Sequence, residues 1–178
     1  DFLILENKKL RELINETVQS EDVYAKVLVD KDSPYLKSII LNKGSKDNIK
    51  IGMAIVDRSY LVGKIIEVNY TNSRALLLSD LNSKIPVLLE PMDIHAVLSG
   101  TGKNYGAIEY TKDEYKKKLT SNEIIVYTSG YGGLFKPGLP IGKIITNNLN
   151  KDNQVNFFSD FRQLDYVKIV SYEIGSGN

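Results

Sequence analysis

The sequence predicts a mainly β protein in which one N-terminal helix precedes small β-domains, built as barrels or sandwiches. Two observations support this fold class. After about the first 20 residues, short runs rich in Val, Ile, Leu and Tyr alternate with clusters of Gly, Asn, Asp and Ser, a texture typical of many short strands. In addition, one strand–turn–strand pattern occurs twice along the chain, which suggests two domains of related build.

The N-terminal helix is predicted over Phe2–Thr17, a stretch that lacks Gly and Pro and is rich in Leu, Glu, Lys and Asn. Leu3 and Leu10 lie seven residues apart, as in a heptad repeat. Leu13 continues the same face, with Ile14 beside it. Because about two heptads are too few to establish a coiled coil, the helix either pairs two subunits or packs on its own domain.

Twelve strands are predicted after this helix, each a short apolar or β-branched run bounded by turn residues. Outside the N-terminus, the one helical feature expected is a turn at Asp113–Leu119. So many strands in about 150 residues favour barrels or sandwiches over a parallel α/β sheet. The predicted strands are Tyr24–Val29, Ser38–Leu41, Met53–Asp57, Leu61–Val68, Ala75–Leu78, Pro86–Leu89, His95–Ser99, Gly106–Tyr110, Ile124–Thr128, Ile141–Thr146, Gln154–Phe158 and Tyr166–Ser171.

The repeated pattern ends in the same five-residue run, an apolar residue followed by Gly-Lys-Ile-Ile, at residues 62–66 and again at 141–145. Each run follows a short strand and a turn. Gly inside a strand usually marks a bulge or a close backbone approach, so Gly63 and Gly142 are expected where a small barrel curls. The pattern indicates two related β-domains, or else a chance similarity between two hairpins.

A glycine-rich loop covers residues 128–142, with five glycines and two prolines in fifteen positions. It does not resemble a phosphate-binding loop, because Gly142-Lys143 runs into Ile144 and a strand follows. The apolar side chains of Tyr131, Leu134 and Phe135 must either pack under the loop or meet a partner, and they are candidates for partner contact. The residues interpreted as structural are Thr128, Ser129, Gly130, Gly132, Gly133, Gly138, Pro140 and Gly142.

Composition excludes several classes of function. The chain has no cysteine and one histidine, so a zinc site is not expected, and no metal or cofactor is predicted. A net charge of +1, from 23 basic and 22 acidic residues, argues against nucleic-acid binding, including by an oligonucleotide-binding barrel. No Ser-x-x-Lys motif is present, which excludes the active site of a penicillin-binding enzyme.

One enzyme class needs separate consideration, because two β-barrels also describe chymotrypsin-like serine hydrolases. His95, Asp113 and Ser129 follow the required chain order. Ser129 lacks the Gly-Asp-Ser-Gly-Gly surroundings of that class, however, and His95 lies in an apolar-rich strand where a structural histidine is expected. The two-barrel hydrolase is therefore the alternative, and no catalytic residue is assigned.

Several segments resemble the MreC family of bacterial rod-shape proteins. The run Leu-Val-Gly-Lys-Ile at residues 61–65 matches the family, as do residues 73–80 with 85–87. The most specific match is Thr-Ser-Gly-x-Gly-Gly at residues 128–133, followed by the Phe, Gly, Pro and Gly of the same loop. The order holds from the N-terminal helix to about Tyr172. Lys136 stands where the family commonly has Pro, and Asn48 where Gly is usual.

The resemblance implies an architecture: a coiled-coil helix over residues 1–20, then two small β-barrel domains over 21–100 and 101–178, with strands exchanged between them. It also implies a membrane helix ahead of Asp1 and a place on the extracytoplasmic (periplasmic) face of the inner membrane. The expected function is that of a non-enzymatic scaffold which maintains rod shape by organising and activating lateral peptidoglycan synthesis.

The partners that the resemblance implies are a second copy of the chain, MreD, MreB, RodZ and the elongation-specific penicillin-binding transpeptidase. Leu3, Leu10, Leu13 and Ile14 would then mediate self-association. Exposed strand edges or the loop at residues 131–135 would supply the other contacts, since an unpaired edge can accept an added strand.

Overall fold

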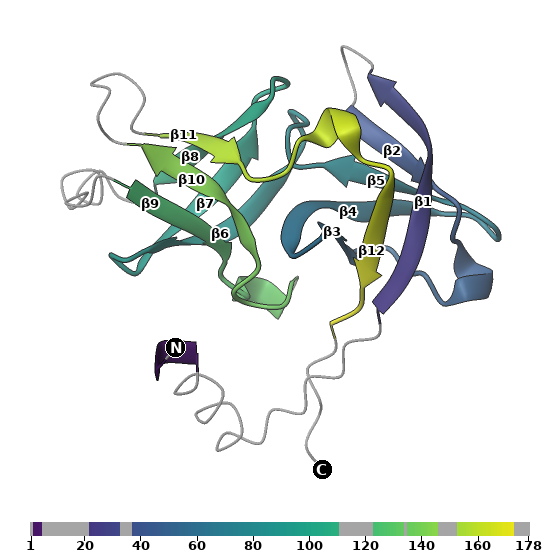
Figure 1. Ribbon diagram of the computed structural model, residues 1–178, viewed down its shortest axis with the longest axis horizontal. Coiled ribbons are helices and arrows are strands. Elements are labelled where there is room, and N and C mark those ends of the chain that lie inside the picture. Colours follow the sequence, from purple (N-terminus) through teal and green to yellow (C-terminus); the bar gives the residue numbers. More distant parts are fainter. Residues whose placement is uncertain are drawn as a thin grey trace.

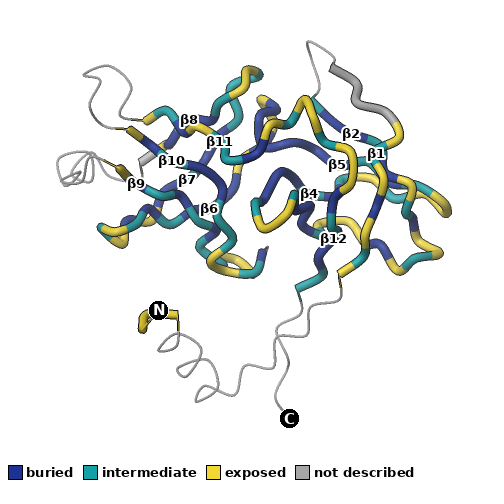
Figure 2. The backbone as a smooth tube through the Cα atoms, viewed as in Figure 1, coloured by how far each residue is buried: buried dark blue, intermediate teal, exposed yellow. Residues whose placement is uncertain are grey.

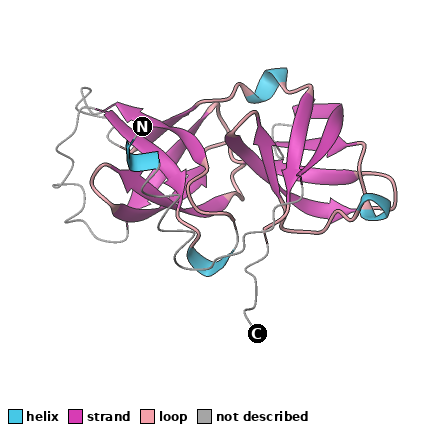
Figure 3. Ribbon diagram, turned by 60° about the horizontal axis from the view of Figure 1, so that its bottom comes forward, coloured by secondary structure: helices cyan, strands magenta, loops and turns pink. Residues whose placement is uncertain are grey.

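The computed structural model describes residues 2–4, 22–32, 37–110, 123–133, 135–145 and 153–172. Within this part of the chain, two β-barrels lie side by side (Figure 1). Helical structure there is limited to short turns at the periphery (Figure 3), and no described helix has the length and apolarity to cross a bilayer. The fold is therefore mainly β, as the sequence predicts.

The first barrel is closed by six strands that pair antiparallel throughout. Buried side chains such as Ile39, Ile65 and Ala75 fill the interior of this barrel. In their order around the barrel, the strands are β1 (Asp22–Asp32), β12 (Tyr166–Val170), β3 (Ala54–Asp57), β4 (Tyr60–Val68), β5 (Ser73–Leu77) and β2 (Lys37–Leu41).

The second barrel is also closed by six antiparallel strands. All twelve predicted strands are thus present, and their ends differ from the prediction by at most three residues. The helical turn expected at Asp113–Leu119 lies outside the described residues. In order around the barrel, the strands are β10 (Pro140–Ile145), β11 (Gln154–Phe157), β8 (Tyr105–Tyr110), β7 (Ile94–Gly100), β6 (Lys84–Glu90) and β9 (Glu123–Thr128).

Three short 3-10 helices connect described strands. Asn48, which closes the helix η1, has φ 62°, the left-handed conformation that Asn tolerates in place of Gly. The helices are η1 (Ser45–Asp47), η3 (Tyr131–Gly133) and η4 (Phe161–Gln163).

The two barrels have the same strand order if β1 to β5 are matched with β7 to β11. The remaining position, between the first and third strands of each set, is filled by β12 in the first barrel and by β6 in the second. Each of these strands follows the fifth strand of the other barrel, so the sixth strands are exchanged. The chain therefore changes barrel between Leu77 and Lys84, not at residue 100, and returns at Tyr166.

The repeated sequence pattern occupies equivalent hairpins in the two barrels. Gly63 lies in β4, where an added Cβ would overlap the carbonyl oxygen of Leu76 in β5. Gly142 lies in β10, the equivalent strand, where an added Cβ would overlap the carbonyl oxygen of Asn156 in β11. Glycine is thus needed at both sites because the neighbouring strand approaches too closely for a side chain.

Two apolar clusters form the core. In Figure 2 the buried residues, coloured dark blue, lie along the strands of both barrels. One cluster fills the first barrel. The other fills the second barrel and continues across the junction through residues of the first. The two barrels are therefore packed against each other through a shared apolar core. The first-barrel residues in the shared cluster are Ala54, Val56, Leu61 and Val170.

Candidate interaction surface

The glycine-rich loop between β9 and β10 is closed at its base by Thr128. The Thr128 hydroxyl donates a hydrogen bond to the carbonyl of Lys136 at 2.6 Å and accepts one from the amide of Leu139 at 2.9 Å. Its backbone adds bonds to Leu139 and Gly138, each at 2.9 Å. Because Thr128 is 1% exposed, these bonds lie in a region of low dielectric and hold the loop in one shape.

Four glycines at the turns of this loop have positive φ angles. Ser129 accepts a hydrogen bond at its hydroxyl from the amide of Tyr131 at 3.2 Å, and Pro140 opens β10. The left-handed region favours glycine, so the chain can reverse here with little strain. The glycines concerned are Gly130 (φ 72°), Gly132 (φ 73°), Gly133 (φ 68°) and Gly138 (φ 85°).

Two of the three candidate partner-contact residues of this loop are described, and their side chains have opposite environments. Phe135 is 3% exposed and belongs to the core cluster of the second barrel, so its assignment as a partner-contact residue is wrong. It anchors the loop instead. Tyr131 is 75% exposed and remains available to a partner. Leu134 lies outside the described residues.

Tyr131 lies over His95, with 6.3 Å between their ring centroids and 59° between their planes. His95 is on β7, where alternation places Ile94 and Ala96 inside the barrel and His95 on its exposed outer side. The tilted contact is a favourable geometry for two aromatic rings. The histidine thus belongs to the surface beside the loop.

A partly exposed apolar face continues from this pair across the outside of the second barrel. In the register of the sheet, Leu88 of β6 lies opposite both His95 of β7 and Tyr127 of β9. Pro86 lies opposite Val97 in the same way. We call this surface the Leu88 face; it consists of Pro86, Leu88, His95, Val97, Ile125, Tyr127 and Tyr131.

The strand edges expected as partner sites are paired. Both barrels are closed, and each of the twelve described strands has a hydrogen-bonded neighbour on both sides. Addition of a partner strand to an open sheet is therefore not supported for these strands. Side-chain surfaces such as the Leu88 face are left to make contacts.

The hydrolase alternative finds no support in the described geometry. The Ser129 hydroxyl is engaged by Tyr131, and among the described residues no hydrogen bond joins it to His95. Asp113 lies outside the described residues. In the same part of the chain, no group of three His, Asp or Glu side chains is placed to hold a metal ion.

Of the helix residues predicted to pair subunits, Leu3 lies in a helical turn at Phe2–Ile4 and is 67% exposed. Leu10, Leu13 and Ile14 lie outside the described residues.

Comparison with known proteins identifies the family. Residues 27–171 match the family model described as rod shape-determining protein MreC, barrel core. This chain belongs to the MreC family. The cell shape-determining protein MreC of Cereibacter sphaeroides is 34% identical over 149 residues, which cover 83% of this chain and 48% of that relative. MreC of Haemophilus influenzae is 31% identical over 163 residues, covering 89% and 44%. The chain therefore spans about half the length of these relatives or slightly less.

Solved MreC structures share the fold. MreC from Pseudomonas aeruginosa superposes with a TM-score of 0.72 at 22% identity, covering 85% of this chain and 99% of that one. MreC of Listeria monocytogenes gives 0.79 at 22% identity, covering 99% and 90%. A complex between a penicillin-binding protein, PBP2, and MreC from Helicobacter pylori gives 0.58 at 13% identity, covering 86% and 99%. The two-barrel architecture is thus that of the MreC structures.

Proposed function

We propose that this chain is a non-enzymatic scaffold of lateral peptidoglycan synthesis, and that it binds the elongation-specific penicillin-binding transpeptidase through the Leu88 face. The observation that carries the proposal is the exposed Tyr131, which lies on His95 beside an apolar sheet surface. The Helicobacter pylori complex supports the choice of partner, since there an MreC of the same fold is bound to a penicillin-binding protein.

The composition of the Leu88 face suits a protein interface. Tyrosine is enriched at the centres of interfaces, where its ring buries a large apolar area and its hydroxyl can still form a hydrogen bond. Leu88 and Tyr127 extend the apolar area across β6 and β9. An ion pair joins Glu123, at the start of β9, to Lys143 of the neighbouring β10, with 3.6 Å between the charged atoms. We expect an apolar centre bordered by charges, the usual anatomy of a specific contact.

A scaffold of this kind acts through binding alone. It shifts the partner toward an active conformation if it binds that conformation more tightly than the inactive one. A factor of ten in relative affinity corresponds to about 1.4 kcal/mol. We propose that the closed barrels provide the rigid surface for this preference, at the periplasmic face of the inner membrane, with MreD, MreB and RodZ as further members of the assembly.

Self-association through the N-terminal helix is the second part of the proposal. Leu3 is exposed, as a residue that pairs with another subunit would be in a single copy. Sedimentation equilibrium of the chain beside a form lacking residues 1–20 tests this. The proposal predicts that the full chain dimerises and the shortened one does not. The same oligomeric state for both forms would contradict it.

The partner assignment is tested by interferometry with the immobilised extracytoplasmic part of the transpeptidase. Tyr131→Ala should weaken binding by about tenfold or more, as truncation of a central aromatic residue does at other interfaces. Tyr70→Ala is the matched control, because Tyr70 is 71% exposed against 75% for Tyr131 but lies outside the Leu88 face. Equal affinities for the two variants would contradict the proposed surface.

A further inference from the structure

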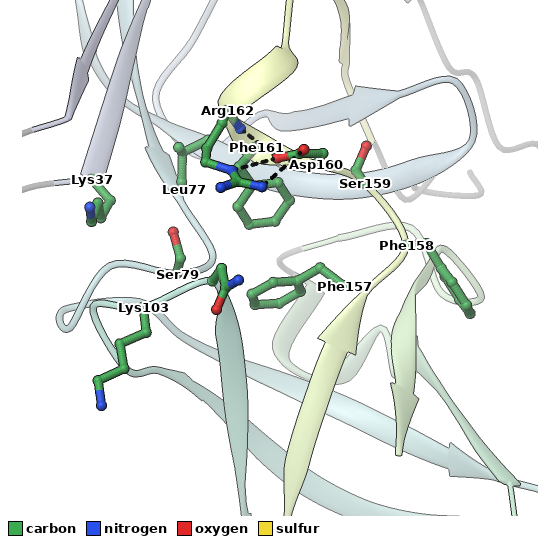
Figure 4. A pocket seen from close by; sticks show the side chains of 11 residues that line it. Lys37, Leu77, Ser79, Lys103, Phe157, Phe158, Ser159, Asp160, Phe161 and Arg162 are labelled. Carbon is green, nitrogen blue, oxygen red and sulfur yellow. Dashed lines mark hydrogen bonds and ion pairs between the residues drawn. The ribbon is translucent and has the colours of Figure 1, made fainter. Parts of the chain in front are cut away.

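A second site lies at the junction of the two barrels, away from the Leu88 face. It is a pocket of about 510 Å³, within the size range of about 300–1,000 Å³ of ordinary ligand sites. Figure 4 shows it from close by. None of its lining residues belongs to the Leu88 face. The lining consists of Lys37, Leu77, Ser79, Lys103, Asn104, Phe157, Phe158, Ser159, Asp160, Phe161 and Arg162.

The base of this junction pocket is apolar and aromatic. The rings of Phe157 and Phe161 stack with centroids 4.7 Å apart and an interplanar angle of 29°. Leu77, 4% exposed, lies beside them in the lining. Both phenylalanines pack against the barrel cores, so the base is held in place. A surface of this kind favours an apolar side chain over a strongly hydrated group.

The charged groups of the pocket are mostly basic. Lys37, Lys103 and Arg162 line it, against the single carboxylate of Asp160. The negative charge of Asp160 is compensated by Arg162, which donates a hydrogen bond to one carboxylate oxygen at 3.2 Å and to the other at 3.4 Å. These bonds also lower the pKa of Asp160. Lys103, exposed at the rim, favours an anion there.

Two buried serines line this pocket. Ser79 lines the pocket and is 5% exposed. In the described part of the chain its backbone carbonyl accepts a hydrogen bond from the amide of Gly102. The hydroxyl of Ser159 donates a hydrogen bond to the carboxylate of Asp57. A serine hydroxyl can donate a hydrogen bond to a carboxylate, so Ser79 provides a donor in the lining for an anionic ligand.

We propose that the junction pocket binds a peptide segment of a partner protein in which an apolar side chain is flanked by carboxylates. The apolar side chain would lie on Phe157 and Phe161, and the carboxylates would meet Lys103 and Ser79. A sugar acid fits less well, because many hydroxyls would need polar partners, and the uncharged polar lining is limited to two serines, one of them engaged, and Asn104.

The test is an NMR titration of the ¹⁵N-labelled chain with three peptides: acetyl-Glu-Phe-Glu-amide, its charge-reversed form acetyl-Lys-Phe-Lys-amide, and acetyl-Glu-Ala-Glu-amide, which lacks the apolar group. The proposal predicts saturable shifts at Ser79, Lys103 and Phe157 with the first peptide, and much weaker responses to the other two. N-acetylmuramic acid serves as the sugar-acid probe, and tighter saturation of the same amides by it would overturn the peptide assignment.

Charge reversal at the rim adds a second readout. Lys103→Glu should weaken binding of the acidic peptide by about fivefold or more, since it replaces an attraction by a repulsion near the peptide carboxylate. Lys103 is exposed in a loop, so the variant should fold normally. Lys46→Glu, an exposed lysine of η1 outside the pocket, is the matched control and should bind like the parent. No saturable shift with the acidic peptide, or equal effects of the two substitutions, would overturn the proposal.

Discussion

The hydroxyl of Ser159 donates a hydrogen bond to the carboxylate of Asp57, although the two residues lie 102 positions apart in the sequence. Asp57 ends β3 in the first barrel, and Ser159 lies on the connection that leaves the second barrel for β12. Next to this bond, Tyr60 contacts Phe158 with 5.1 Å between ring centroids. The connection is thereby held against the β3–β4 turn, where it can deliver β12 into the first barrel.

Removal of this hydrogen bond should reduce the stability of the protein. Ser159→Ala leaves the carboxylate of Asp57 without that donor and should cost about 1–3 kcal/mol, since the bond is partly buried and involves a charged acceptor. Denaturant unfolding measures the loss. A double-mutant cycle with Asp57→Asn supplies the control, because the two effects should be markedly less than additive. Strict additivity would show that the two side chains are not energetically coupled.

The two equivalent glycines should respond alike to substitution. Gly63→Ala and Gly142→Ala each place a methyl group against a carbonyl of the neighbouring strand, so each should destabilise by at least about 2 kcal/mol. Gly52→Ala is the comparison: Gly52 has φ 93° but nothing within 4 Å of an added Cβ, and should cost about 1 kcal/mol through the backbone alone. Thermal unfolding would contradict this account if Gly52→Ala were the most harmful of the three.

The strand exchange predicts an effect of truncation far from the cut. A chain ending at residue 165 lacks β12, so the first barrel loses the strand that pairs with β1 and β3. We expect amides of β1 and β3 to lose hydrogen-exchange protection first, while those of β7 and β9 retain more of theirs. Exchange measured by NMR tests this. Loss of protection confined to the new C-terminus would contradict the role of β12 in closing the barrel.

Glu109 should contribute to the loss of folding stability at acidic pH. The hydroxyl of Ser99 donates to its carboxylate at 2.8 Å, and the ammonium group of Lys84 lies 3.4 Å away; together, with Ser99 the larger cause, they lower the pKa of Glu109. A depressed folded-state pKa stabilises the protein above the unfolded-state pKa, and this contribution is lost as the pH falls through the folded-state pKa.

Ser99→Ala should therefore raise the pKa of Glu109 toward the ordinary glutamate value and reduce the loss of stability in acid. Carbon-13 NMR titration of the Glu109 carboxyl group measures the pKa directly. Lys84→Gln should raise it less, because it removes the coulombic attraction, a smaller single cause than the Ser99 hydrogen bond, while the Gln amide can still donate a hydrogen bond. A larger rise in Lys84→Gln than in Ser99→Ala would reverse the assigned order of causes.

Local features of the fold were accessible from the sequence. Short apolar or β-branched runs bounded by turn residues identify all twelve strands, because each strand carries its own local signal. The exchange of β6 and β12 between the barrels, by contrast, leaves no local signal in the sequence. Nothing in Lys84–Glu90 or Tyr166–Val170 states which barrel the strand will enter, since either barrel offers a similar gap. A single boundary at residue 100 therefore does not describe the two barrels, and the exchange of strands was expected from the family resemblance alone.

The candidate surfaces were predicted less completely. The glycine-rich loop was recognised and Tyr131 was singled out, but its composition alone could not show that Phe135 turns inward. The alternation of β6 and β7 would have placed Leu88 and His95 on the outer face, if the exposed phase of each strand had been followed. The junction pocket draws on Ser79, Phe157 and Arg162, which only the folded chain brings together.

The most direct test of the central claim is photo-cross-linking of the full-length protein in its own host. Benzoylphenylalanine is introduced at position 131, and separately at position 70, where Tyr70 has nearly the same exposure as Tyr131. We predict a cross-link between position 131 and the elongation-specific penicillin-binding transpeptidase, and none from position 70. A cross-link to that enzyme from position 70 alone would contradict the assignment of the Leu88 face as the binding surface.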